Sequence, residues 1–310
     1  MDTISMIRRK AASDLKTIAL PEMEDERTLE AARILEKEKI VKVVLVDAGK
    51  VAGEEKEKYA QQYCELRKAK GMTIEQARQV MQDPLYIAEM MARNGVVDGC
   101  VAGASHTTAD VARAAIHCLG INERFGIASS CFIMAVPDCE YGDNGTFVFA
   151  DCGVIPDPNP RQLGCIAVAS AELAKKVLGL IPRVAFLSYS TRGSSAGRLV
   201  DKVKEALALA RQMQPDLLVD GELQVDAAII PEVTRIKYPD SPIQGRANVL
   251  IFPDLNAGNI SYKLVQRLAK ARALGPLIMG LNKPCSDLSR GCTVDDIIDC
   301  AAVTAIRAQA

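Results

Sequence analysis

The chain has 310 residues, 49% of them hydrophobic and 25% charged, and a formal net charge of −1. This composition is typical of a globular protein of about two domains, and the balanced charge disfavours nucleic-acid binding. The chain contains two histidines, no tryptophan and 4% aromatic residues. This composition disfavours a histidine-rich metal site and a platform of aromatic residues for stacking nucleic-acid bases.

Short strands and longer amphipathic helices alternate along the first 120 residues. Strands are predicted at Thr17–Leu20, Val41–Val46 and Gly99–Gly103. Helices are predicted at Glu26–Glu38, Glu54–Arg93 and Thr107–Leu119, and the long second one should break at Gly71 and near Pro84. The apolar run 41–46 is nearly continuous, which is typical of a parallel strand buried on both faces.

The rest of the chain begins with a strand-rich stretch, so a domain boundary is predicted near Gly120–Phe125. Strands are expected at Ile127–Val136, Thr146–Ala150, Val184–Tyr189, Leu217–Val219, Val249–Phe252 and Pro276–Met279. Helices are expected at Gln162–Leu178, Leu199–Met213, Gly258–Arg272 and Val294–Ala308. Repeated strand–helix units predict an α/β fold with mainly parallel sheets.

The ten cysteines include no C-x-x-C pair, which argues against the usual zinc, iron–sulfur and thioredoxin motifs. We expect most of them to be small buried hydrophobes in a reducing compartment. No apolar leader follows Met1, and no run approaches the roughly 18 apolar residues of a membrane span. These features predict a cytoplasmic protein with no membrane partner.

Polar clusters follow several predicted strands, at the end where open α/β sheets bind ligands. Residues Ser188–Ser195 combine hydroxyls, glycine and one arginine, which suits an anion, although the same residues could simply cap the next helix. Residues Ala104–Thr108, followed by Arg113, leave the same two alternatives open. His106 is expected to be a hydrogen-bonded structural residue.

The densest polar cluster lies between Gly280 and Asp296. Thr293 and Asp296 resemble a helix capping box, which explains the carboxylate without any chemistry. That explanation leaves out Ser289 and Arg290. A hydroxyl, a guanidinium and a carboxylate in one loop could bind phosphate and move a proton.

Five segments of the chain carry recognisable motifs, namely Thr17–Asp25, Ser188–Ser194, Asp220–Ile229, Ala247–Asn259 and Leu281–Cys292. Together they resemble the phosphate acetyl/butyryltransferase family, and its acetyl branch more than its butyryl branch. The resemblance extends from about residue 17 to residue 310.

The resemblance implies two α/β/α domains of the isocitrate/isopropylmalate dehydrogenase type, with the active site in the cleft between them. Residues 1–124 with 283–310 would form the first domain and residues 125–282 the second. The implied reaction is the reversible conversion of acetyl-CoA and phosphate to acetyl phosphate and CoA. The resemblance also implies a homodimer, acetate kinase as pathway partner, no bound cofactor or metal, and activation by monovalent cations.

The resemblance also assigns roles to individual residues. Asp296 matches the carboxylate that deprotonates the CoA thiol, Ser289 the hydroxyl beside it, and Arg290 the residue that holds acetyl phosphate. The residues expected to bind CoA or phosphate are Arg67, Arg113, Arg267, Thr191 and Ser194. One departure is Ala114, which stands beside Arg113 where the family usually has proline.

Several alternatives remain open at this stage. Direct transfer to CoA competes with a covalent acyl carrier at Cys139 or Cys292. A metal-dependent decarboxylating dehydrogenase would need ligands such as Asp151, Asp220 and Asp226. A butyryl or other short-chain specificity and a non-catalytic acetyl-CoA-sensing domain are further alternatives. The setting could be acetate formation, acetate uptake, or ethanolamine breakdown in a bacterial microcompartment.

Overall fold

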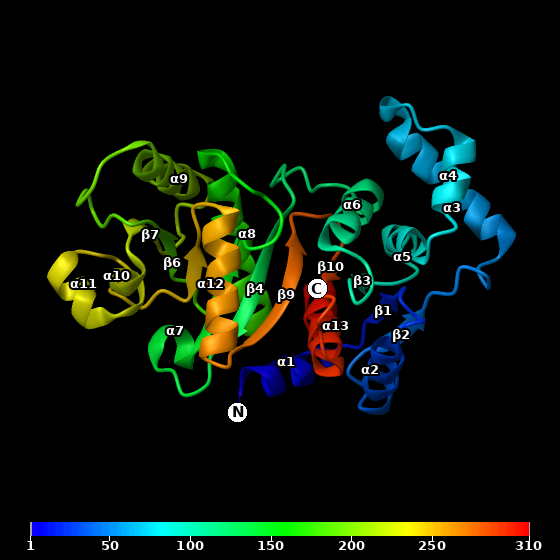
Figure 1. The fold of residues 1–310 in the computed structure, drawn as a ribbon, viewed down its shortest axis with the longest axis horizontal. Coiled ribbons are helices and arrows are strands. Elements are labelled where there is room, and N and C mark those ends of the chain that lie inside the picture. Colours follow the sequence, from blue (N-terminus) through cyan, green and yellow to red (C-terminus); the bar gives the residue numbers. More distant parts are fainter. Residues whose placement is uncertain (1, 310) are drawn as a thin grey trace. The chain divides into compact units, whose positions relative to one another are not determined.

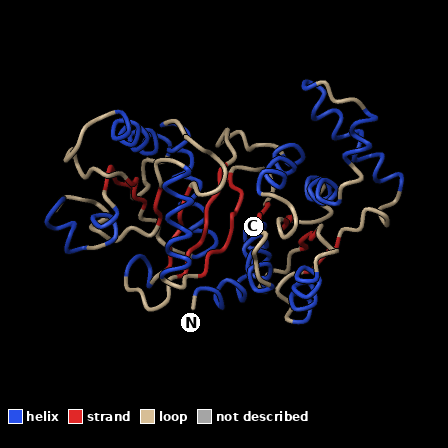
Figure 2. Tube along the Cα trace, viewed as in Figure 1, coloured by secondary structure: helices blue, strands red, loops and turns tan. Residues whose placement is uncertain are grey.

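The computed structural model describes residues 2–309, which divide into two compact units (Figure 1). The first unit joins the residues up to Ala128 with those from Gly280 onward, and the second is Ser129–Met279. Helices lie around the strands of each unit (Figure 2). The sequence places its boundaries at 124/125 and 282/283, and the active-site cleft expected between the domains stays a prediction.

The first unit has four parallel strands in the order β2–β1–β3–β10. Its elements are α1 (Thr3–Ala12), β1 (Thr17–Leu20), α2 (Glu26–Lys37), β2 (Lys42–Leu45), α3 (Gly53–Arg67), a 3₁₀ turn (Lys68–Lys70), α4 (Ile74–Val80), α5 (Pro84–Arg93), β3 (Gly99–Ala102), α6 (Thr108–Leu119), β10 (Cys285–Asp287) and α13 (Val294–Ala308). The last helix, α13, packs against α1, α2 and β3. The C-terminal segment therefore lies beside the N-terminal one.

Two details of the first unit test the sequence predictions. The expected break of the long helix is confirmed, since Gly71 adopts a left-handed conformation after the 3₁₀ turn and Pro84 begins α5. The prediction that strand 41–46 is buried on both faces is wrong, because Lys42 is exposed and Leu45 is 38% exposed. β2 is an edge strand with β1 on one side only, so its apolar run extends beyond the covered area.

The second unit has six strands in the order β9–β4–β5–β8–β6–β7. Its elements are β4 (Ser129–Ala135), α7 (Tyr141–Asn144), β5 (Thr146–Ala150), α8 (Pro160–Leu178), β6 (Val184–Leu187), α9 (Arg198–Met213), β7 (Val219–Leu223), α10 (Val225–Ile229), α11 (Pro231–Lys237), β8 (Val249–Ile251), α12 (Leu255–Leu268) and β9 (Arg272–Met279). Strand β4 is antiparallel to β5 and β9, and the other pairs are parallel. The predicted α/β fold with mainly parallel strands is confirmed.

Long-range pairing explains where element boundaries differ from the predictions. The helix predicted at Gly258–Arg272 ends at Leu268, because Arg272 already pairs with Ala135 of β4. Strand β7 continues to Leu223 through two buried acidic residues, which hide it from a search for apolar runs. Strand β10 is only three residues long and escapes prediction for that reason.

The prediction that most cysteines are buried is confirmed. All ten are free thiols and eight are buried, whereas Cys64 and Cys139 are half-buried. Within residues 2–309, no helix combines the length and the apolar character that a membrane crossing requires.

Candidate active site

The polar loop predicted to carry the chemistry connects β10 to α13. Ser289 and Arg290 are exposed, and the Ser289 hydroxyl accepts a hydrogen bond from the amide of Gly291 at 3.3 Å. Asp296 accepts from the amide and hydroxyl of Thr293 at 2.8 and 2.9 Å, and Thr293 accepts from the amide of Asp296. The predicted capping box is confirmed. It fixes the Asp296 carboxylate at the start of α13, seven residues beyond Ser289 along one ordered loop.

Arg27, on the first turn of α2, holds this loop in place. Its Nη1 donates to the carbonyls of Arg290 and Cys292 at 3.0 and 2.8 Å. Its Nη2 donates to the carbonyl of Ala104 at 3.0 Å, and Asp25 binds the other edge of the guanidinium. One planar cation therefore joins the segments that follow β1, β3 and β10.

Glu22 forms a second anchor at the same strand ends. Its buried carboxylate accepts hydrogen bonds from the amides of Gly103, Ala104, Ser105 and His106. The His106 ring also bonds to it, at 2.8 Å. Burial opposes the charge of Glu22, but these hydrogen bonds outweigh burial and lower its pKa to about 2. The same bond raises the pKa of His106, so this histidine serves the structure, as predicted.

Asp287 is a buried carboxylate two residues before Ser289. A Cβ added at Gly103 would lie 2.3 Å from its Oδ1, so the glycine is needed for this close approach. Burial raises the pKa of Asp287 to about 7, against the opposing effect of the Thr108 hydroxyl and the Leu288 amide. Near neutral pH the Asp287 carboxyl is therefore only partly ionised.

The sequence predictions include none of Glu22, Arg27 and Asp287 as site residues. The same strand-end rule that singled out the loops after β3 and β6 would have found Glu22, because it follows the predicted strand Thr17–Leu20 directly. Arg27 lies inside the predicted helix Glu26–Glu38, where that rule does not apply. No motif in the neighbouring sequence marks Asp287, because it stands out only through its burial in the folded protein.

Cys292, one candidate acyl carrier, lies within this loop but is buried. Burial raises the pKa of its thiol to about 11, although Arg27 acts in the opposite direction. Because the thiolate is the nucleophilic form, Cys292 is poorly suited to attack an acyl group.

Two of the predicted arginines lie near each other in the first unit. Arg67 is in the last turn of α3, and its Nε is buried with no hydrogen-bond partner among the described residues. Arg113 is exposed on α6 and pairs with Asp110 at 2.8 Å. Helix α6 is continuous from Thr108 to Leu119, so Ala114 in place of proline leaves Arg113 on a regular helix.

The loop after β6 contains the predicted substrate-binding hydroxyls. Ser194 accepts from the amide of Thr191 at 3.0 Å, and the Thr191 hydroxyl accepts from the amide of Gln224 at 3.0 Å. Glu222 lies beneath the loop and accepts from the amide of Gly193 at 2.7 Å. None of these hydroxyls caps α9, whose N-cap is Gly197, so the simple capping alternative is wrong for this loop.

The remaining predicted residue, Arg267, is exposed in the last turn of α12 in the second unit. The carboxylates considered for a metal have separate partners: Asp151 accepts from Ser130, Asp220 from Ser241, and Asp226 from Lys237. Among residues 2–309, no group of three or more His, Cys, Asp or Glu side chains is placed to hold a metal ion.

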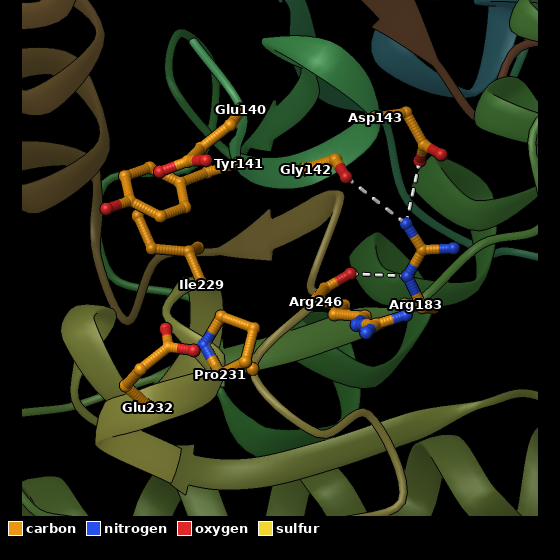
Figure 3. Close-up of a pocket in the computed structure, with 10 residues that line it drawn as sticks. Glu140, Tyr141, Gly142, Asp143, Arg183, Ile229, Pro231, Glu232 and Arg246 are labelled. Carbon is orange, nitrogen blue, oxygen red and sulfur yellow. Dashed lines mark hydrogen bonds and ion pairs between the residues drawn. The ribbon is translucent and has the colours of Figure 1, made fainter.

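A pocket of about 680 Å³ in the second unit is lined by none of the predicted site residues (Figure 3). Its wall is held by Arg183, which donates to Asp143 at 2.9 Å and to the carbonyl of Arg246. A pocket of about 490 Å³ in the first unit is lined in part by Glu22 and His106. This second pocket is also lined by none of the predicted site residues, but its lining includes Asp25, which binds the guanidinium of Arg27.

The chain is similar to known proteins over nearly its whole length. A model of the phosphate acetyl/butaryl transferase family matches residues 2–305. The phosphate acetyltransferases of Thermoanaerobacterium thermosaccharolyticum and Acetivibrio thermocellus are 49% and 48% identical to it, over 100% of this chain and 100% and 99% of theirs. A phosphotransacetylase structure from Streptococcus pyogenes matches with a TM-score of 0.92 at 37% identity, covering 99% of each chain. The EutD phosphotransacetylase from Staphylococcus aureus matches at 0.86 and 36%, covering 99% of this chain and 98% of that one.

Proposed function

Because the chain belongs to the phosphate acetyl/butaryl transferase family, we propose that it transfers an acetyl group reversibly between CoA and inorganic phosphate. The observation that carries the proposal is the end-to-end similarity, up to 49% identity, to phosphate acetyltransferases. The ordered loop that presents Ser289, Arg290 and Asp296 supports it independently. The substrates are small molecules, namely CoA, acetyl phosphate and phosphate.

In the proposed mechanism, Asp296 accepts the proton of the CoA thiol, and Ser289 lies beside the sulfur. The thiolate attacks the acetyl carbonyl carbon of acetyl phosphate, the bond from that carbon to the phosphate oxygen breaks, and phosphate leaves. Arg290 binds the phosphoryl group and stabilises its negative charge. The raised pKa of Cys292 supports direct transfer without an acyl-enzyme.

The proposed substrate contacts come from both units. Arg67 and Arg113 of the first unit and Arg267 of the second bind the anionic parts of CoA, because a guanidinium keeps its charge and can bind phosphate oxygens in pairs. The proposal adds Thr191 and Ser194 as hydroxyl contacts to CoA or phosphate.

We also propose that the protein is a homodimer whose interface includes α12. This helix exposes Ile260, Leu264 and Leu268 at 57, 52 and 80%. Residues spaced by four lie on one helix face, so these three side chains form an exposed apolar stripe. Such a stripe is typical of a surface that is buried in a protein interface. Light scattering on the wild type and on Leu264→Glu distinguishes a dimer from a monomer. A wild-type monomer would contradict this part of the proposal.

The metabolic part of the proposal follows the family. We place the protein in the cytoplasm, or in a bacterial microcompartment, with acetate kinase as the enzyme that uses or supplies acetyl phosphate. Activation by monovalent cations is part of the same proposal and is tested by assaying activity with and without potassium or ammonium.

The direct test is thioester absorbance after the protein is mixed with CoA and acetyl phosphate. Thioester formation is expected, and none at any potassium or ammonium concentration would contradict the proposed function. CoA binding without turnover would instead favour a sensing domain. Rates with acetyl-, propionyl- and butyryl-CoA in the reverse direction, with phosphate, test whether acetyl is the preferred chain.

A further inference from the structure

His117 lies between the two arginines that we propose for CoA binding, and the mechanism above does not use it. It follows Arg113 by one turn on α6, and its Nδ1 is 3.2 Å from the hydroxyl of Tyr63 on α3. Arg67 follows Tyr63 by one turn on α3. Since helix residues four apart share a face, the Tyr63–His117 contact brings both arginines to the same junction of α3 and α6.

The pKa of His117 reflects this placement. Burial lowers it below its usual 6.5, and the positive charges of Arg67 and Arg113 lower it further. Both guanidinium groups are therefore near enough for their charge to act on the ring, and the free protein holds His117 mostly neutral at pH 7. A bound anion would compensate the arginine charges and so raise the pKa of His117 again.

The surroundings of His117 come from three helices. The titratable and charged groups around this junction are Tyr63 and Arg67 of α3, Asp83, Tyr86, Glu89 and Arg93 of α5 and its N-cap, and Asp110, Arg113 and Cys118 of α6. The Tyr63 and Tyr86 rings meet edge to face, 5.7 Å between centroids, and help to fix the His117 ring. Asp110, the carboxylate paired with Arg113, is exposed.

One donor at this junction lacks a partner. The Nε of Arg67 is buried with no hydrogen-bond partner among the described residues. Buried donors are normally paired, so this one indicates that an acceptor from a ligand belongs here. Tyr63 engages Nδ1 of His117, which leaves Nε2 as the nitrogen available to a phosphate oxygen.

We propose that His117 is a third cation of the CoA-phosphate site formed with Arg67 and Arg113, and that its protonation strengthens CoA binding. The inference rests on the proposed function, which supplies CoA as the ligand. CoA binding then takes up a proton, and the affinity for CoA falls as the pH rises. His117 acts on binding and has no part in moving the acetyl group.

The test compares KM for CoA in the wild type and in His117→Gln between about pH 5.5 and 8. The ratio of the two KM values cancels the titration of CoA itself. A half-buried charge near a phosphate should make KM for CoA roughly three- to tenfold higher in His117→Gln than in the wild type at pH 5.5. The two KM values should become about equal at pH 8. His117→Lys keeps a cation at every pH and should hold the low KM throughout. Lys37→Gln, which removes one exposed charge from α2 of the same unit, controls for general electrostatics.

Calorimetry gives a second readout that does not depend on turnover. CoA binding at about pH 6, measured in two buffers of different ionisation enthalpy, should show proton uptake by the wild type that His117→Gln loses. A ratio that stays flat with pH, or a shift in KM for acetyl phosphate instead of CoA, would overturn the inference while leaving the proposed function intact. Proton-linked CoA binding without any turnover would instead support the inference and contradict the proposed function.

Discussion

The guanidinium of Arg27 donates to the backbone carbonyl of Cys292 at 2.8 Å, across 265 residues of sequence. The same Nη1 reaches the carbonyl of Arg290, one of the residues proposed to bind acetyl phosphate. The loop between β10 and α13, which we propose to be catalytic, is therefore held by a side chain from the opposite end of the chain. Arg27 contacts the loop through the backbone carbonyls of Arg290 and Cys292 and through the Cys292 sulfur at 3.7 Å, and we expect it to act by positioning the loop.

Arg27→Lys should lower kcat, because one ammonium cannot replace a planar group that bonds to three segments at once. A displacement of about 1 Å in reacting groups can reduce the rate roughly a hundredfold, so we expect a loss of roughly ten- to hundredfold. Steady-state kinetics with CoA and acetyl phosphate measure it, with Arg33→Lys on the exposed face of α2 as the matched control. A larger effect on KM for CoA than on kcat would argue against a positioning role.

Asp296→Asn should lower kcat with little change in KM, because asparagine keeps the shape of the cap but cannot accept the thiol proton. Its control is Thr293→Ala, which removes the capping hydroxyl and leaves the carboxylate. That variant should lose about 1 kcal/mol of unfolding free energy and retain most of its kcat. If the two variants lose kcat equally, Asp296 matters as a cap and its role as a base is wrong.

The sequence predicts the local features of this site better than the long-range ones. Helix α13 begins and ends where its apolar periodicity predicts, and the Thr293–Asp296 cap follows from a spacing of three residues. The Glu22 and Arg27 contacts join segments that no spacing relates. They become visible only once β1, β3 and β10 are known to be adjacent, and that order depends on burial and pairing across the whole unit.

The stability of the fold should depend on pH through its buried acids. Burial raises the pKa of Asp287 to about 7 from the 3.8 of an exposed carboxyl. The folded state then keeps a proton that the unfolded state releases, so unfolding free energy falls as the pH rises from about 4 to 7 and levels off above that. A shift of this size corresponds to at most about 4 kcal/mol.

Asp287→Asn should flatten part of this decline, as measured by urea unfolding at several pH values between about 5 and 8. The comparison uses the slope of unfolding free energy against pH, because a loss of stability that is the same at every pH does not change that slope. Burial likewise raises the pKa of Glu89 to about 7, so a decline from Glu89 should persist in the variant. Glu22, with its pKa lowered to about 2, stabilises the fold at neutral pH and loses that effect only below about pH 4.5. An unchanged slope in Asp287→Asn would show that Asp287 is ionised in the folded protein.

Cys292→Ala tests whether the acetyl group passes through the enzyme. In direct transfer the thiol has no chemical role, and its burial with a pKa of about 11 makes it a poor nucleophile. The variant should therefore keep kcat within a few-fold, with a modest loss of stability from the small cavity that the sulfur leaves. Cys139→Ala, at the half-buried cysteine, should behave likewise. A hydroxylamine-sensitive acetyl-protein formed by the wild type and absent from either variant would instead identify that cysteine as an acyl carrier and replace direct transfer with a two-step mechanism.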